Sequence, residues 1–251
     1  MAEPIYRACE ELAKLLVLAT RAQITYVGEE NIPERGGAVI AINHTSYVDF
    51  LPAGLIMRRR HRRLRYMLKA EMQKVKIVNF LIKKNGAIPV ERSSGADAYV
   101  HAVQALRDGE LVAVYPEATI SRSFELKDFK TGAARMAIEA DVPIIPLIVW
   151  GAQRIWTKDH PRQLGRKKIP VTVAAGPPFR AAEDIATTNQ MLRDAMNTLL
   201  HRVQESYPME AGAWWVPRRL GGSAPTLAEA AQLDAAELVS RSQHHSRSGE
   251  G

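Results

Sequence analysis

Short, unbroken apolar runs alternate along this chain with longer stretches in which apolar residues recur at helical spacing. The unbroken runs are typical of strands buried on both faces and predict strands at 23–27, 37–43, 64–68, 87–90, 111–115, 143–149 and 169–173. Helical spacing predicts helices at 4–20, 70–84, 96–108, 130–140, 189–206 and 227–240. Alternating strands and helices predict an α/β fold, a mostly parallel central sheet flanked by helices on both faces.

The same pattern divides the chain into three parts. Residues 1–22 form an N-terminal helix that is a candidate for membrane contact, and residues 23–207 form the main domain. From 208 to 251 the sequence turns to Gly, Ala, Ser and Pro, and we expect a helical C-terminal extension there. Thr226 and Glu229 have the spacing of a capping box, which marks the start of its helix. The last ~10 residues are expected to be disordered, as chain ends often are.

Composition narrows the class of protein. The chain has 251 residues, of which 46% are hydrophobic and 24% charged, and this excludes a disordered or fibrous protein. With one cysteine the chain can form no internal disulfide and no multi-cysteine metal cluster. Neither a signal peptide nor the ~18 apolar residues of a spanning helix is evident, so the expected location is the cytoplasmic side. The net charge of +7 favours an anionic partner or substrate.

Polar residues follow four of the predicted strands directly. His44, Lys69, Arg92 and Glu117 each come within a few residues of a strand's carboxyl end. In an open parallel sheet these ends share one edge, where ligand sites gather, so we expect the four side chains to converge. Loops are polar in any case, which leaves a solvated surface as the alternative for each of them.

The stretch from Asn43 to Asp49 is the most informative. On an unbroken helix His44 and Asp49 would point ~140° apart, so they meet only if His44 lies on the loop and Asp49 in the first helical turn. Ser46 as the N-cap would allow that, and the carboxylate would then orient the imidazole as a general base requires. The alternative is that Ser46 and Asp49 form a capping box and His44 is an ordinary loop histidine.

Four motifs, in order along the chain, carry a family resemblance. They are Asn43-His44 with Asp49; Gly86, Ile88, Val90 and Arg92; the stretch 115–121 with Glu117 and Thr119; and the apolar stretch 142–146 around its prolines. Over residues 25–205 the chain thereby resembles the lysophosphatidic acid acyltransferase (PlsC-like) family of glycerolipid acyltransferases. Ala118 and Ile120 stand where that family has Gly and Arg, and Arg122 is the nearest replacement for the arginine.

The resemblance implies transfer of a fatty acyl group from acyl-CoA or acyl-carrier protein to the free hydroxyl of 1-acyl-glycerol-3-phosphate, giving phosphatidic acid. His44 would be the base and Asp49 its partner, with no covalent acyl-enzyme and no metal or other cofactor. Backbone N–H groups near the start of the helix after His44 would stabilise the oxyanion. Acceptor and phosphate contacts would come from Lys69, Arg92, Glu117, Thr119, Arg122 and Lys130.

Two alternatives stay open at this point. The acceptor could be another lysophospholipid or a glycolipid, because the third motif departs from the family pattern at Ala118 and Ile120. The chain could also be an inactive, basic module that binds membranes or nucleic acid. Oligomeric state is not encoded in any of these patterns.

A basic segment suggests how such a protein meets its substrate. Between residues 58 and 92 there are seven Arg and five Lys against Glu71 and Glu91. Anionic bilayers and nucleic acids both attract such a segment. Apolar residues interleaved with lysines at 72–84 favour the bilayer over nucleic acid. We therefore expect a peripheral or monotopic protein on the cytoplasmic face of the cell membrane, with an anionic membrane surface as its partner.

Overall fold

A computed structural model gives the fold, and it describes residues 11, 15, 17, 20–69, 88–90, 95–163, 165 and 167–248. Its strands are β1 (Ala22–Val27), β2 (Ala38–Ile42), β3 (Leu64–Lys69), β4 (Ile88–Val90), β5 (Leu111–Val114), β6 (Ile144–Trp150) and β7 (Ile169–Ala175). The helices are α2 (Phe50–Arg59), α4 (Gly95–Arg107), α5 (Gly132–Ala140), α6 (Ile185–Ser206) and α7 (Leu227–Ser248). Short 3-10 turns lie at η1 (Glu29–Asn31), η3 (Ala152–Arg154) and η4 (Arg218–Leu220).

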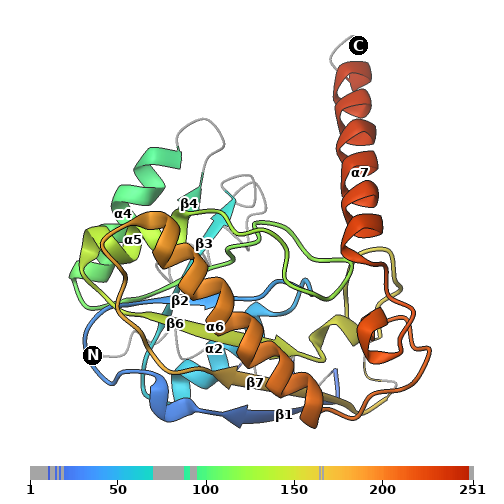
Figure 1. Cartoon of the computed structure of the whole chain (residues 1–251), viewed down its shortest axis with the longest axis horizontal. Helices are drawn as coiled ribbons and strands as arrows, with labels where there is room; N and C mark the ends of the chain where they lie inside the picture. The colour runs from blue at the N-terminus through green and yellow to red at the C-terminus, as the bar shows by residue number, and fades with distance from the viewer. Residues whose placement is uncertain are drawn as a thin grey trace.

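Within these residues the strands form a seven-stranded sheet in the order β1-β7-β6-β2-β5-β3-β4 (Figure 1). Neighbouring strands are parallel except β6 and β7, which run antiparallel. Because β1 is parallel to β7, these two strands point opposite to the other five. The predicted α/β class, with its mostly parallel sheet, is confirmed.

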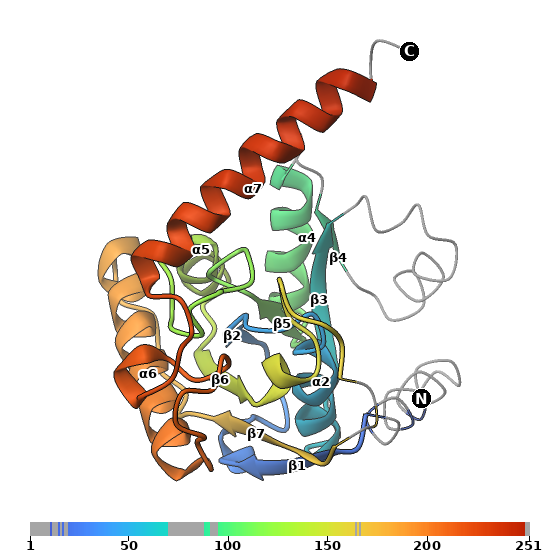
Figure 2. The same ribbon diagram turned by 90° about the vertical axis from the view of Figure 1, so that its right-hand side faces the viewer.

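The sheet is buried on both faces, as the unbroken apolar runs predict. Along β2 every residue is buried, and successive side chains enter opposite cores because strand side chains alternate. Val39 and Ala41 join the core under α4, α5 and α6, whereas Ile40 and Ile42 join the core that includes α2. Figure 2 shows helices on either side of the sheet. A fully buried aliphatic side chain contributes ~1.5–3 kcal/mol, so this double-sided burial holds β2 firmly in place.

Several predicted elements differ from the observed ones. The helix predicted at 227–240 continues to Ser248, into the segment expected to be disordered. The helix predicted at 70–84 lies outside the described residues. Of the helix predicted at 4–20 the described residues 11, 15 and 17 are helical. The part of the chain that the structure describes contains no helix that is both long and apolar enough to cross a bilayer.

Asn43 fixes the point at which the chain leaves β2. Its side-chain amide donates to the carbonyl of Val149 at 3.1 Å, and its Oδ1 accepts from the backbone N–H of Val149 at 2.7 Å. The Asn43 side chain is fully buried. Its two hydrogen bonds satisfy the backbone groups of Val149 on β6, as the backbone of a neighbouring strand would. His44, the next residue, therefore starts from a fixed position at the end of the strand.

Replacing Asn43 with Ala should destabilise the protein by about 2–4 kcal/mol, since both buried backbone groups of Val149 lose a partner. Urea unfolding of the wild type and of Asn43→Ala measures this loss. Asn31→Ala is the matched control, because Asn31 makes one such bond, from its amide to the carbonyl of Ala175 at 2.9 Å. Equal losses of unfolding free energy in the two variants would show that the paired hydrogen bonds from Asn43 to β6 stabilise the protein no more than the single bond from Asn31.

Candidate active site

His44 and Asp49 meet at the carboxyl end of β2. Nδ1 of His44 lies 3.2 Å from Oδ2 of Asp49. The Asp49 side chain is fully buried, while that of His44 is 22% exposed. An ionised Asp49 accepts a hydrogen bond from Nδ1–H, and Nε2 is then left as the basic nitrogen. The predicted pairing of the imidazole with the carboxylate is present in the structure.

The same carboxylate oxygen also shapes the turn. Oδ2 of Asp49 accepts from the backbone N–H groups of Thr45, at 2.9 Å, and Ser46, at 2.8 Å. Asp49 thus orients the imidazole and also holds the turn. The capping box considered as the alternative is not formed, because α2 begins only after Asp49 and no side-chain hydrogen bond caps it. Burial raises the pKa of Asp49, against the hydrogen bonds from His44 and the two amides, which act to lower it.

The prediction that Ser46 is the N-cap residue of the helix was wrong. The residue that precedes α2 is Asp49 rather than Ser46, because residues 47–49 form a turn and the helix begins at Phe50. The Ser46 hydroxyl instead donates to the carbonyl of Trp156 at 2.6 Å and accepts from the N–H of Val48. It ties the catalytic turn, residues 44–49, to the loop that follows β6.

Backbone amides of this turn are engaged within the protein. The N–H groups of residues 44, 45, 46, 47 and 48 bond in turn to Glu117, Asp49, Asp49, the carbonyl of Trp156 and the Ser46 hydroxyl. Oxyanion donors were expected near this point. Residues 44–48 do not supply them in this arrangement, since each of their amides already has an acceptor.

Glu117 connects the loop after β5 to the catalytic turn. Its Oε1 accepts from the N–H of His44 at 2.9 Å and its Oε2 from the N–H of Lys127 at 3.1 Å. The N–H of Ser121 donates to the carbonyl of His44, and the ring of Tyr115 lies 4.3 Å from the imidazole. Burial raises the pKa of Glu117 to about 7. Its carboxylate therefore holds backbone in place, a role distinct from the expected contact with acceptor.

The other predicted acceptor contacts are not all brought together. Arg122 is 8% exposed, and its guanidinium donates to the carboxylates of Asp159, Asp234 and Glu237. Its guanidinium group is already paired with carboxylates of this chain, contrary to the expectation that it replaces the family's phosphate-binding arginine directly. The Thr119 hydroxyl accepts a hydrogen bond from the Lys127 ammonium group.

For three other predicted cations the structure shows no contact that would identify a phosphate site among the described residues. Lys130 is exposed, and its N–H donates to the carbonyl of Pro116. The backbone of Lys69 ends β3 and pairs with Val90 of β4, which puts the residue at the carboxyl edge of the sheet. Arg92 lies outside the described residues. Phosphate contacts by Lys69, Arg92 and Lys130 stay predictions.

The two departures from the family motif have structural correlates. Ala118 has φ +60°, a left-handed conformation that glycine adopts freely and that costs an L-residue ~1–2 kcal/mol. The glycine usual at this position is thereby explained. Ile120 is buried, so the side chain that stands in for the family's arginine packs into the protein.

Two further cations near the site were missed by the sequence reasoning. The ammonium group of Lys127 contacts Thr119 and Asp234, and that of Lys158 contacts Asp234 and Glu237. No local pattern points to them, because their acidic partners lie far along the chain, on α7.

A strand-end histidine held by a buried carboxylate, in an α/β fold, is a candidate general base with its orienting partner, an arrangement found in enzymes. The profile of the family described as acyltransferase matches residues 23–150, and the chain belongs to that family of enzymes. The expected relationship to PlsC-like proteins is confirmed.

Relatives of known name agree with this assignment. The 1-acyl-sn-glycerol-3-phosphate acyltransferase of Bacillus subtilis is 29% identical over 148 residues, covering 59% of this chain and 72% of the relative. The protein of that name from Borreliella burgdorferi is 26% identical over 162 residues, covering 61% of this chain and 60% of the relative. The crystal structure of PlsC, the 1-acyl-sn-glycerophosphate acyltransferase of Thermotoga maritima, matches with a TM-score of 0.67 at 17% identity. That match covers 83% of this chain and 86% of the other, and it shows the shared fold.

The raised pKa of Glu117 predicts a pH effect on stability. The folded pKa of about 7 exceeds the ordinary 4.5, so the folded state binds more protons between these values and stability falls as pH rises through that window. The Glu117 contribution should reach up to ~3 kcal/mol between pH 4 and pH 8. Urea unfolding across this range should show a steeper decline for the wild type than for Glu117→Gln. Parallel curves would contradict the prediction.

Proposed function

We propose that this enzyme transfers a fatty acyl group from an acyl thioester, acyl-CoA or acyl-carrier protein, to the free hydroxyl of 1-acyl-glycerol-3-phosphate. The product would be phosphatidic acid. The observation that carries the proposal is the 3.2 Å contact between Nδ1 of His44 and the buried carboxylate of Asp49. The names of the Bacillus and Borreliella relatives support the choice of acceptor.

The chemistry follows from this pair. An alcohol is a poor nucleophile near neutral pH, so Nε2 of His44 takes its proton while the oxygen attacks the thioester carbonyl. Asp49 stabilises the imidazolium that forms and holds the ring in the required tautomer. The tetrahedral intermediate then collapses, the carbon–sulfur bond breaks, and the thiol sulfur recovers the proton from His44. The acyl group passes directly to the acceptor, with no covalent acyl-enzyme.

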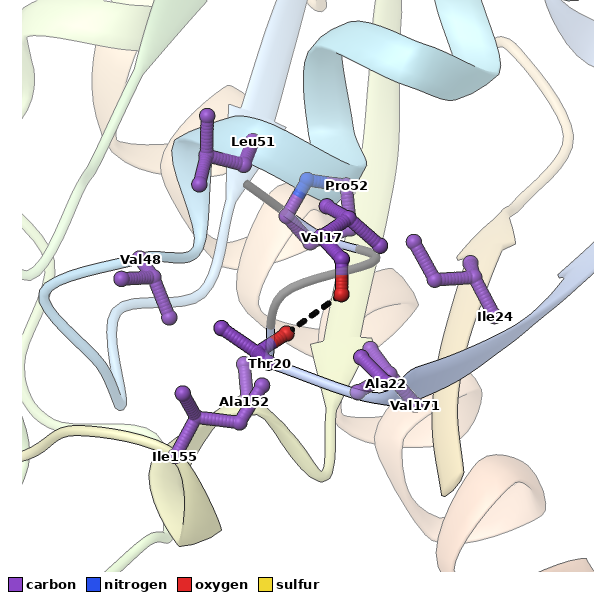
Figure 3. A pocket seen from close by; sticks show the side chains of 10 residues that line it. All are labelled: Val17, Thr20, Ala22, Ile24, Val48, Leu51, Pro52, Ala152, Ile155 and Val171. Atoms are coloured by element: carbon purple, nitrogen blue, oxygen red, sulfur yellow. Dashed lines mark hydrogen bonds between the residues drawn. The ribbon is translucent and has the colours of Figure 1, made fainter. Parts of the chain in front are cut away.

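An apolar pocket adjoins the catalytic turn. Figure 3 shows side chains from the N-terminal segment, β1, the catalytic turn, α2, η3 and β7 around a small pocket. The volume of this pocket is about 20 Å³. Val48 and Leu51 border both this pocket and the turn, while the Thr20 hydroxyl bonds to the carbonyl of Val17. The lining is apolar, but a space of this size admits about one water molecule, so an acyl chain could enter only if these side chains moved apart.

His44→Ala should lower acyl transfer by ~10²–10⁴-fold, because the base is lost. The assay is free-thiol release from acyl-CoA with 1-acyl-glycerol-3-phosphate as acceptor. A panel of lysophosphatidylinositol and glycolipid acceptors, and acyl-carrier protein as second donor, decides the substrates. His101→Ala, on an exposed face of α4, is the matched control and should retain activity. Full activity in His44→Ala would exclude His44 as the base, and wild-type inactivity with every acceptor would favour the inactive membrane-binding module.

We also propose that the enzyme works as a peripheral protein on an anionic membrane surface. The arginine run at 58–65 gives this less support than its charge suggests, because several of its arginines are paired with carboxylates of the same chain. Arg59 pairs with Glu29, Arg60 with Glu34 and Arg65 with Glu110. Better support comes from the aromatic side chains of Tyr47, in the catalytic turn, and Phe50, the first residue of α2, which are 42% and 45% exposed. Aromatic side chains favour the bilayer interface.

Sedimentation with vesicles tests this proposal. The wild type should bind vesicles containing anionic phospholipid, with binding that weakens as salt is added, and should bind neutral vesicles less. Phe50→Ser should weaken the binding, whereas Val100→Ser, which removes a more exposed apolar side chain (61%) from α4, should not. Equal binding to neutral and anionic vesicles, or equal effects of the two substitutions, would contradict it.

A further inference from the structure

Three cationic side chains gather beside the catalytic turn. Arg122 and Lys127 come from the loop after β5, and Lys158 comes from the loop after η3. Their side chains are largely buried, with exposed fractions of 8%, 18% and 12%. Asp159 neutralises part of this charge through its bond to Arg122 at 2.5 Å. The group formed by Arg122, Lys127, Lys158 and Asp159, called the cation cluster below, carries a net charge of +2.

Both loops of the cation cluster are hydrogen-bonded to the catalytic turn. The N–H of Lys127 bonds to Glu117, whose other oxygen accepts from the N–H of His44. On the other side, the Thr157 hydroxyl donates to the carbonyl of Thr45 at 2.7 Å. The cation cluster is therefore part of the frame of the catalytic turn, although sequence reasoning connected only Arg122 with it.

Two carboxylates of α7 cover the cation cluster. Asp234 accepts hydrogen bonds from Arg122, from Lys127 at 3.1 Å and from Lys158 at 3.4 Å. Glu237 accepts from Arg122 and from Lys158, both at 2.9 Å. Asp234 and Glu237 are three positions apart and so share one face of the helix. Together they bring a charge of −2, which matches the net +2 beneath them.

These ion pairs attach the middle of α7 to the described part of the body. Of residues 231–240, all of them described, Asp234 and Glu237 are partly buried and the others are exposed. Leu238, at 68% exposed, is one of several apolar side chains that face solvent there. Figure 2 shows α7 projecting away from the body of the protein. A helix held by ion pairs rather than by apolar burial can be displaced by an anion that bonds to the same cations, because the anion takes over their hydrogen bonds while the released carboxylates return to water.

We propose that the cation cluster is a phosphate-binding subsite, and that Asp234 and Glu237 close it as a displaceable acidic latch. A phosphomonoester is the matching ligand, because it carries a charge of about −1.5 to −2 at pH 7 and three acceptor oxygens. Arginine and lysine donors at this density are what such a group requires. The assignment of that phosphate to a substrate rests on the proposed function. Both the acceptor, 1-acyl-glycerol-3-phosphate, and the donor, through the 3′-phosphate of CoA, carry a phosphomonoester.

Hydrogen exchange of α7 tests the latch in the full-length protein, with inorganic phosphate as the probe. Phosphate should speed exchange in residues 231–240 more than potassium chloride at the same ionic strength. The double variant Asp234→Asn/Glu237→Gln should exchange rapidly without phosphate. Its affinity for phosphate, measured by 31P NMR, should rise by ~5–10-fold, because the subsite no longer has to open.

Two further variants make the test specific. Glu210→Gln/Asp141→Asn removes the same charge from exposed ion pairs elsewhere and should bind phosphate like the wild type. Adding Lys158→Gln to the latch variant should cancel its gain in affinity. If α7 unfolds in the latch variant, the cluster is still uncovered and the gain must still appear. Unchanged phosphate affinity in the latch variant, or equal effects of phosphate and chloride on exchange, would overturn the proposal.

Kinetics then distinguish the two sources of phosphate. A lower KM for 1-acyl-glycerol-3-phosphate in the latch variant, with kcat unchanged, assigns the subsite to the acceptor. A lower KM for acyl-CoA but not for acyl-3′-dephospho-CoA assigns it to the donor. A rise in both KM values would overturn the latch. These outcomes are separable from the proposed function, because a wild type that transfers no acyl group would refute that function while the exchange and binding measurements still decide the latch.

Discussion

The buried carboxylate of Asp49 is the constraint on which the site depends. One of its oxygens accepts from the imidazole of His44 and from two backbone amides of the catalytic turn, so ring orientation and loop shape are set by the same atom. Removing the carboxylate would release both at once. The fixed spacing of the motif has a structural reason, because the four residues between His44 and Asp49 are the length of turn that lets the carboxylate reach back to the strand end. Asn43 supplies the fixed starting point by its clamp on β6.

Much of the fold followed from the sequence, because strands buried on both faces leave unbroken apolar runs. β2, β5 and β6 are of this kind, and each was predicted close to its observed bounds. The meeting of His44 with Asp49 was also predictable, since helix geometry leaves one way for the two to touch. The antiparallel direction of β7 could not be predicted, because a short apolar run carries no information about strand direction.

Charge was harder to interpret than hydrophobicity. Counting residues in a window gave a strongly basic segment after residue 57, yet Glu29, Glu34 and Glu110 approach it from other parts of the chain and pair with its arginines. Lys127 and Lys158 had no local signal for the same reason. The partners of a charged side chain are decided by tertiary structure, and its ion pairs join residues that sequence spacing does not relate. A predicted role for a cation, such as that of Arg122, therefore depends on which carboxylates the fold brings to it.

The antiparallel pairing of β6 with β7 decides where the chain enters the sheet. Since β1 follows the direction of β7, its first residue, Ala22, pairs with Ile169 at the end of the sheet towards which β2 runs. Were β7 parallel to β6, Ala22 would lie at the opposite end, remote from the imidazole. The reversal instead brings Thr20 and Ala22 to a pocket that they share with Val48. One strand inversion thus sets Thr20 and Ala22 at the same end of the sheet as the imidazole of His44.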